Sequence, residues 1–237
     1  MARITPALVL LVTLAFGAAP FLTPPFRGYD PAIFPVLIDR PSIQPAGYAF
    51  SIWGVIYTWL FVHAIAGLWR RADHSAWAAS RLPLILAVAL GAVWLNIAAA
   101  APILATLTIW IMALGAIAAF LRAPTQPDRW LLSAPLAIFA GWLSAAAAVS
   151  LGVVLAGHGI LSDTASATAM LALVLVIALT VQWQKPAMPI YGLTVIWALL
   201  GVIVANWGLN PVPVVLAALA IAAVDGLLIV NRRRLRG

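Results

Sequence analysis

Three aromatic side chains in the segment 45–57 have a spacing that places them on one face of a helix. Phe50, Trp53 and Tyr57 follow an i, i+3, i+7 pattern, and helical residues three or four positions apart are neighbours. Their rings would form a flat, polarizable wall with a hydroxyl at one end. Such a wall suits a planar hydrophobic ligand, although the same spacing also serves ordinary packing between helices.

Two ionisable residues, His63 and Asp225, lie inside long apolar runs. An ionisable group inside a membrane is costly and is by default a functional hypothesis. His63 lies six residues before Trp69 and Asp225 six residues before Asn231, which the rise of a helix converts to a depth of about 9 Å. Equal depth in one leaflet allows an intramembrane polar pair between the two helices. The alternative is that each contacts water near the interface.

Several classes of site are excluded by residue type. The chain contains no Cys, which rules out disulfides, thiolate metal sites and Cys nucleophiles. The sequence shows no HExxH, P-loop or Ser–His–Asp arrangement, so we predict no metal and no catalytic residue. The net charge of +7 does not predict nucleic-acid binding, because the basic residues lie in short connections and at the C-terminus rather than along a stripe.

The composition predicts an all-α integral membrane protein. Of the 237 residues, 65% are hydrophobic and 8% charged, with a mean hydropathy of +1.10, whereas soluble domains carry about 25% charged residues. A transmembrane helix needs about 20 apolar residues. Eight such runs are predicted, at 4–22, 46–69, 82–100, 103–121, 131–156, 165–184, 189–207 and 211–230.

The charge distribution supports eight spans with both termini in the cytoplasm. An even number of spans puts both termini on one side, which then holds eleven of the thirteen basic residues, leaving Arg27 and Arg40 opposite. We therefore expect a multi-pass protein of the inner cell membrane. The run 4–22 is expected to be a span rather than a cleaved signal peptide, because it exceeds the 7–15 residues of a signal core.

The connection 23–45 is unlike the others because it is long, apolar and rich in proline. It holds the aromatic residues Phe26, Tyr29 and Phe34 between five prolines. Loops of this kind are often lids over a site, and the alternative is a segment lying on the bilayer surface. Tryptophan favours the headgroup region, but five of the eleven Trp lie deeper in their runs and are candidates for a buried cavity: Trp53, Trp94, Trp110, Trp142 and Trp197.

The segment with Phe50, Trp53 and Tyr57, preceded by Pro45, resembles the second-helix signature of the tryptophan-rich sensory protein family (TspO/MBR, the translocator-protein family). Leu95–Asn96 resembles that family's Leu–Asn element, and Pro135 with Trp142 resembles its fifth helix. The resemblance covers residues 1–156, as a five-helix region with 23–45 as the lid. Residues 157–237 would add three transmembrane helices and a basic cytoplasmic tail.

The chain departs from the family pattern at several positions. Ala46 and Ile52 stand where the family usually has proline, and Tyr48 where it usually has Trp. Ser150 lies near a position where the family often has Asn. Family members mostly have five helices, so the chain resembles a long, divergent relative.

The resemblance implies a binding cavity inside the five-helix region, closed by the first loop. The implied ligands are tetrapyrroles such as protoporphyrin, or sterol-like lipids. We predict that no cofactor is required and that a tetrapyrrole can be bound. Some bacterial relatives are linked to photooxidative breakdown of porphyrin, and the Trp pair implicated there corresponds to Trp53 and Trp142.

The leading hypothesis is a membrane receptor or binding protein with an aromatic cavity for a hydrophobic small molecule. The predicted ligand-binding residues are Tyr48, Phe50, Trp53, Tyr57, Asn96 and Trp142. One alternative is a small proton-coupled secondary transporter using His63 and Asp225. A second is a light-dependent porphyrin-degrading protein, the only enzymatic activity considered. Small residues four apart, as at Ala87 and Gly91, suit either packing within the chain or a homodimer.

Overall fold

Eight α-helices form most of the described part of the chain, and their connections are short except for the one between α1 and α2. The computed structural model describes residues 4–24, 26 and 28–236. The helices are α1 (Ile4–Leu22), α2 (Ile52–Trp69), α3 (Ser75–Ala100), α4 (Pro102–Arg122), α5 (Ala134–Gly157), α6 (Asp163–Gln184), α7 (Ile190–Asn206) and α8 (Pro211–Arg234). Three short elements accompany them: η1 (Pro31–Ile33), η2 (Gly47–Ser51) and η3 (Arg129–Ser133). The eight predicted runs are therefore confirmed as helices.

The helix starts follow from local chemistry. Pro102 and Pro211 occupy the first turns of α4 and α8, where the missing N–H of proline costs little. Ser162 caps α6 by accepting from the Ala165 N–H, and Asn210 caps α8 by accepting from the Val212 N–H. These side chains satisfy backbone donors that a helix leaves free at its start.

The start of α3 differs from the sequence prediction. We expected residues 70–81 to be a polar connection, but α3 already begins at Ser75. Arg81 is buried in this added part of the helix, where its guanidinium donates to the Arg71 carbonyl oxygen at 2.7 Å. The tertiary contact satisfies the charged group, so a helix can form where hydropathy alone predicts a loop.

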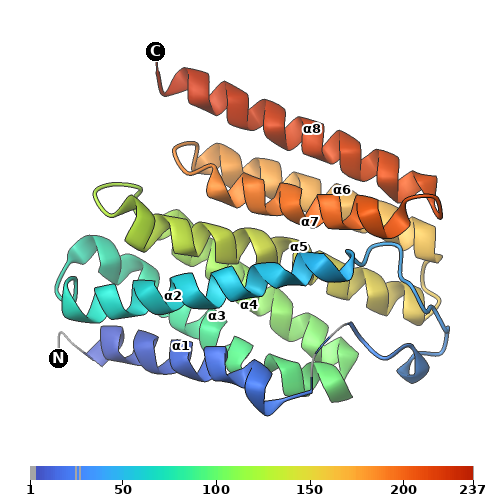
Figure 1. The fold of residues 1–237 in the computed structure, drawn as a ribbon, viewed down its shortest axis with the longest axis horizontal. Helices are drawn as coiled ribbons and strands as arrows, with labels where there is room; N and C mark the ends of the chain where they lie inside the picture. Colours follow the sequence, from blue (N-terminus) through green and yellow to red (C-terminus); the bar gives the residue numbers. More distant parts are fainter. Residues whose placement is uncertain (1–3, 25, 27, 237) are drawn as a thin grey trace.

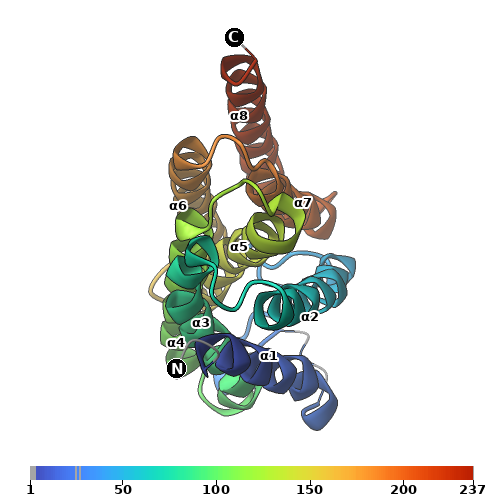
Figure 2. The same ribbon diagram turned by 90° about the vertical axis from the view of Figure 1, so that its left-hand side faces the viewer.

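The helices close two rings that share α5. In the first ring α1 contacts α2, α2 contacts α5, and α4 and α3 complete the circuit back to α1. In the second ring α5 contacts α6 and α7, and both of these contact α8. Figure 2 shows α5 between the two groups, with α1 and α8 at opposite extremes of the molecule.

The shared position of α5 explains its composition. All but four of its 24 residues are buried, and small side chains allow neighbouring helices to approach closely. A Cβ at Gly141 would lie 2.7 Å from the Tyr191 carbonyl oxygen on α7, and one at Gly152 would lie 2.9 Å from Met170 on α6. The small residues considered as a dimer face, among them Ala87 and Gly91, are likewise buried between helices of one chain.

The chain is a multi-pass membrane protein. Among the described residues, seven helices are long and apolar enough to span a bilayer, and α7 is a shorter apolar helix of 17 residues. A length of 17 residues is at the lower limit for spanning. Helix α1 begins and α8 ends at the same end of the bundle, and residues 28–45 of the connection between α1 and α2 lie at the other end (Figure 1). We call these the terminal end and the lid end.

Candidate functional site

The predicted aromatic wall forms at the lid end of α2. The rings of Trp53 and Tyr57 stack with centroids 5.3 Å apart and an interplanar angle of 20°. Trp142 of α5 meets this wall edge-on, 5.8 Å from Phe50 and 6.1 Å from Trp53. Phe16 of α1 closes the other side, with its centroid 4.9 Å from that of Tyr57. The fold therefore brings together the four predicted residues Phe50, Trp53, Tyr57 and Trp142. It adds Phe16 of α1, which was not predicted.

Two adjoining cavities lie against this wall, and we call them the larger and the smaller lobe. The larger lobe has a volume of about 280 Å³ and the smaller about 80 Å³. The lobes adjoin because five residues line both: Phe26, Phe50, Trp53, Trp94 and Ile109. Pockets for small molecules are mostly apolar with a few placed polar groups, and both lobes have this character.

The larger lobe lies inside the first ring of helices and is aromatic. Besides the shared residues, its lining includes Phe16, Tyr57, Gly91, Leu95, Met112 and Leu143. Gly91 allows α1 to come close, because a Cβ there would lie 2.5 Å from the Phe16 ring. This packing keeps Phe16 against Tyr57 and Trp53, and so completes the aromatic enclosure.

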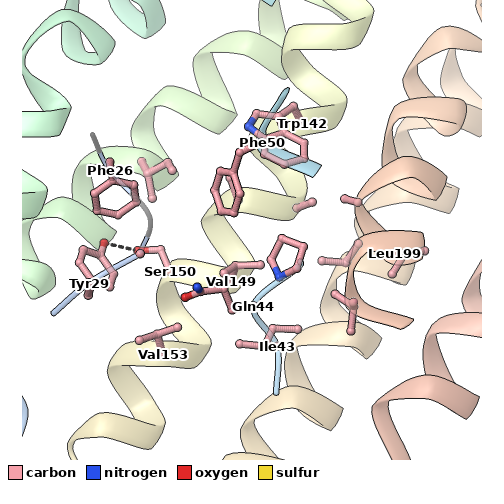
Figure 3. Close-up of a pocket in the computed structure, with 18 of the residues that line it drawn as sticks. Phe26, Tyr29, Ile43, Gln44, Phe50, Trp142, Val149, Ser150, Val153 and Leu199 are labelled. Carbon is pink, nitrogen blue, oxygen red and sulfur yellow. Dashed lines mark hydrogen bonds between the residues drawn. The ribbon is translucent and has the colours of Figure 1, made fainter. Parts of the chain in front are cut away.

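The smaller lobe extends from the aromatic wall toward the second ring of helices (Figure 3). Its far wall is aliphatic and comes from the lid, α5, α6 and α7: Ile43, Val149, Val153, Leu171, Val174, Ala198, Leu199 and Val202. Helices α6 and α7 therefore contribute directly to the wall of the site. They belong to the part of the chain that the sequence analysis left without a role.

The polar groups of the smaller lobe lie on one side of it. Tyr29 of the lid hydrogen-bonds through its hydroxyl to Ser150 Oγ at 2.6 Å (Figure 3), and Ser150 Oγ also bonds to Thr106 Oγ1 at 2.6 Å. Burial raises the pKa of Tyr29, so its hydroxyl stays a neutral hydrogen-bonding group. Gln44 also lines this lobe, and no charged side chain lines either lobe among the described residues.

Trp142 carries the one notable unsatisfied group of the cavity. The side chain is 2% exposed, and its Nε1–H has no hydrogen-bond partner among the described residues. A buried donor without a partner costs about 1–3 kcal/mol. The indole ring lines the smaller lobe, so a small movement of the ring would present this donor to an acceptor on a ligand.

The lid is fastened to the second ring of helices at Ser42. Its backbone N–H donates to Asp163 Oδ1 at 2.9 Å, and its hydroxyl donates to the other carboxylate oxygen. Its carbonyl oxygen accepts from Asn206 Nδ2 at 2.8 Å, and Asn210 Nδ2 donates to its hydroxyl at 3.1 Å. A further backbone bond runs from the Val36 N–H to the Gly157 carbonyl oxygen. The starts of α6 and α8 and the end of α7 thus hold the lid over the cavity.

Helix α7 also positions the start of the aromatic segment. The Ala46 N–H donates to the Gly201 carbonyl oxygen at 2.9 Å, and Trp197 Nε1 donates to the Ala49 carbonyl oxygen at 3.0 Å. A Cβ at Gly201 would lie 2.8 Å from Pro45 Cβ and 2.9 Å from Ala49 Cβ. Glycine is therefore required for this close approach, which fixes η2 and, with it, Phe50.

Four of the six predicted ligand-binding residues line the cavity, and two do not. Phe50, Trp53, Tyr57 and Trp142 line one or both lobes. Tyr48 is 45% exposed and packs edge-on against Trp197, with centroids 5.5 Å apart. Asn96 is exposed, and its neighbour Leu95 lines the larger lobe instead.

The structure does not bring His63 and Asp225 together. His63 is buried at the terminal end, where its Nδ1–H donates to the Leu131 carbonyl oxygen at 2.8 Å and its ring stacks on Trp77. Asp225 is exposed on α8, which packs against α6 and α7 rather than α2. The sequence predicts how deep each residue lies in the membrane, but not which helices are neighbours. Because α8 does not pack against α2, the two residues are apart.

A polar cluster beside His63 joins two connections at the terminal end. Trp77 Nε1 donates to Asp128 Oδ2 at 2.8 Å, and the Arg71 guanidinium makes two bonds to the same carboxylate, at 2.7 and 3.0 Å. The hydrogen bonds from Arg71 hold the pKa of Asp128 below its ordinary value. This cluster lies away from both lobes and has the character of a structural tie.

Several lining residues were not among those predicted. Phe16 gave no signal, because α1 is apolar throughout and its sequence does not show which face is buried. Trp94 had been singled out only for its depth in the third run. Tyr29 and Ser150 carry no motif, and only the folded lid brings them to 2.6 Å.

Comparison with known proteins gives one family. The model of the TSPO-like protein family matches residues 38–231, which extend from the lid through α8. No curated protein and no solved structure matches the chain. Within the described residues, no group of three His, Asp or Glu side chains has the arrangement of a metal site.

Proposed function

We propose that this chain, which belongs to the TSPO-like protein family, is a membrane receptor or binding protein for a planar hydrophobic ligand. The observation that carries the proposal is the two-lobed aromatic cavity, whose wall includes the ring of Trp142 with its unpartnered, buried N–H. Membership of the family makes a porphyrin-type ring the first ligand to test. The larger lobe would hold the ring against Phe50, Trp53 and Phe16.

Recognition would rest on stacking and on burial of apolar surface. Aromatic pairs in good geometry contribute about 0.5–1.5 kcal/mol each beyond burial. Micromolar binding corresponds to about 8 kcal/mol, so burial of the apolar surface of the ring must supply a large part of the affinity beside the stacking contacts and a hydrogen bond from Trp142. No acid–base group is needed for this function.

The experiment compares two double variants in detergent. Trp53→Phe with Trp142→Phe changes the cavity, whereas Trp69→Phe with Trp207→Phe changes two Trp that are 78% and 74% exposed. Binding of protoporphyrin and of its neutral dimethyl ester is followed by the shift of their absorption bands. We expect the cavity variant to bind about ten-fold more weakly, a loss of roughly 1.4 kcal/mol, and the control to bind as the parent does. Equal binding by all three proteins would refute the cavity assignment.

Orientation in the membrane is part of the proposal. The terminal end carries the basic residues of the short connections and of the α8 tail, such as Arg122, Lys185 and Arg234. By the positive-inside rule this end faces the cytoplasm and the lid faces the opposite side of the inner membrane.

Light-dependent breakdown of a porphyrin remains a second candidate for the same cavity. The contact between Trp53 and Trp142 would place two oxidisable indoles beside a photosensitising ring. Loss of the porphyrin absorption band under illumination but not in darkness distinguishes this activity from binding. The proton-coupled transporter receives no support from the positions of His63 and Asp225.

A further inference from the structure

The two lobes differ in the chemistry of their walls. The larger lobe is enclosed by rings, including Phe16, Trp53 and Tyr57. The far wall of the smaller lobe is built from branched aliphatic and alanine side chains of α5, α6 and α7, such as Leu171, Val174 and Leu199. A rigid ring system alone would use the first wall and leave the second without a contact.

The geometry points to a ligand that has a planar ring and a flexible aliphatic tail. We propose that the smaller lobe is a separate subsite for this tail, and that the ring lies in the larger lobe. The inference rests on the proposed function, because it assumes that a ring binds at the aromatic wall. It adds the role of α6 and α7, whose side chains at Leu171, Val174 and Ala198 shape the tail subsite.

The polar groups indicate the chemistry of the ring. Trp142 Nε1 is a buried donor without a partner among the described residues. Trp142 lines the smaller lobe and makes edge contacts with Phe50 and Trp53, which line both lobes. The described lining contains no charged side chain, and burying an unpaired ionised group is costly. A neutral ring with a carbonyl oxygen satisfies both conditions.

An isoprenoid quinone has this combination of properties. Its ring is planar and neutral, its carbonyl oxygen would accept from Trp142 Nε1, and its tail would follow the aliphatic wall. The width of the tail subsite depends on small side chains at Ala198 of α7 and Ala146 of α5. Replacing either by leucine should fill the subsite and leave the aromatic lobe unchanged.

The test uses two quinone probes that share a ring. Ubiquinone-0 has no tail and ubiquinone-2 has two isoprene units, and binding of each is measured by quenching of Trp fluorescence. The ratio of the two dissociation constants is compared between proteins in the same detergent, so that partition of the tail into micelles cancels. Burial of the tail's methyl and methylene groups should make ubiquinone-2 bind the parent at least about ten-fold more tightly.

Two lobe-filling variants and one matched control decide the outcome. Ala198→Leu and Ala146→Leu should each retain the binding of ubiquinone-0 and lose most of the advantage of ubiquinone-2. Ala172→Leu, on an exposed position of α6 next to Leu171, should behave as the parent. Retained binding of the tailless probe shows that each variant is folded.

The results separate the inference from the function on which it rests. If the parent binds both quinones equally, or if both lobe-filling variants keep the full advantage of the tail, the tail subsite is refuted while ring binding stands. If the parent binds neither the quinones nor the porphyrins, the proposed function itself fails.

Discussion

The indole of Trp142 combines a place in the cavity wall with a cost to the stability of the fold. Its position on α5 places the ring at the junction of the two lobes, in edge contact with Phe50 and Trp53. Its N–H remains without a partner in a buried environment. A residue selected only for packing would avoid this cost, because phenylalanine fills similar space without a donor.

Four of the residues predicted from the sequence line the cavity, and two, Tyr48 and Asn96, do not. The spacing of Trp53 and Tyr57 survives because both lie on the regular helix α2. Tyr48 lies in η2 two residues before Phe50, so its side chain leaves the backbone about 200–240° away from that of Phe50 in either helical geometry. It therefore packs against Trp197 rather than lining the cavity.

The carboxylate of Asp128 gives a pH-dependent prediction. Its pKa is held below the ordinary value of 3.8 by hydrogen bonds from Arg71, so the folded state favours the charged form. The resulting stabilisation is fully present above pH 3.8 and is lost as the pH falls through the lower pKa of the folded state. We expect Asp128→Asn to lower the unfolding temperature at pH 7. Below the pKa of Asp128 in the folded state, where the carboxyl of the parent is protonated, the two proteins should unfold at the same temperature.

The measurement is thermal unfolding in detergent as a function of pH. Asp39→Asn changes an exposed carboxylate of the lid and should follow the parent throughout. A constant difference between Asp128→Asn and the parent at all pH values would show that the ion pair does not account for the stabilisation.

At the scale of elements, the close contact between η2 and α7 sets the position of the aromatic wall. Gly201→Ala places a methyl group within 2.8–2.9 Å of Pro45 and Ala49. Overpacking of this kind costs about 1–3 kcal/mol, and it should displace Phe50 and weaken ligand binding along with stability. Unfolding temperature and porphyrin affinity measure the two effects.

Gly54→Ala is the matched control for this substitution. Gly54 lies on the exposed side of α2, and a Cβ there meets no atom within 4 Å. Alanine should raise helix stability by up to about 1 kcal/mol without changing affinity. Destabilisation by Gly54→Ala, or a neutral Gly201→Ala, would contradict the packing account.

The lid gives a second prediction for elements. Asp163→Ala removes both carboxylate bonds to Ser42, so the segment from Val36 to Gln44 should open more often. We expect faster hydrogen exchange at the Ser42 amide and a several-fold faster release of ligand. Ser162→Ala removes the cap of α6 at the neighbouring residue and separates helix fraying from loss of the lid anchor. Unchanged exchange in Asp163→Ala would mean that other bonds hold the lid.

The bounds of most helices were predictable from hydropathy, and the differences have physical causes. Long apolar runs are a strong signal. Both bounds of α1 and the C-terminal bound of α2 agree with those predicted, whereas residues 47–51 of the second run form the 3₁₀ element η2. The first turns of α3 were missed because the burial of Arg81 depends on the carbonyl oxygen of Arg71. Such contacts exist only after the chain has folded.

For the whole molecule, hydropathy and charge predicted the number of helices but not which helices are neighbours. Charge and hydropathy gave eight spans, and the beginning of α1 and the end of α8 at one end agree with that number. The sharing of α5 by two rings depends on small residues such as Gly141 and Gly152. In a chain so rich in alanine, these positions do not stand out before the partners are known.

Orientation is testable because the chain has no Cys. A single Cys introduced at Asp39, in the lid, should react with a membrane-impermeant thiol reagent from outside intact cells. A single Cys introduced at Gln184, at the end of α6, should react only after the membrane is opened. The positive-inside rule predicts this result, and the reverse pattern of labelling would invert the proposed topology.

The central claim is that a planar hydrophobic ligand binds between the aromatic wall and the lid. The most direct measurement is an experimental structure of the protein with protoporphyrin dimethyl ester bound. We expect ligand density in the larger lobe, with the ring against Phe50 and Trp53 and an acceptor near Trp142 Nε1. Density confined to the lipid-facing surface, with both lobes unchanged, would contradict the account.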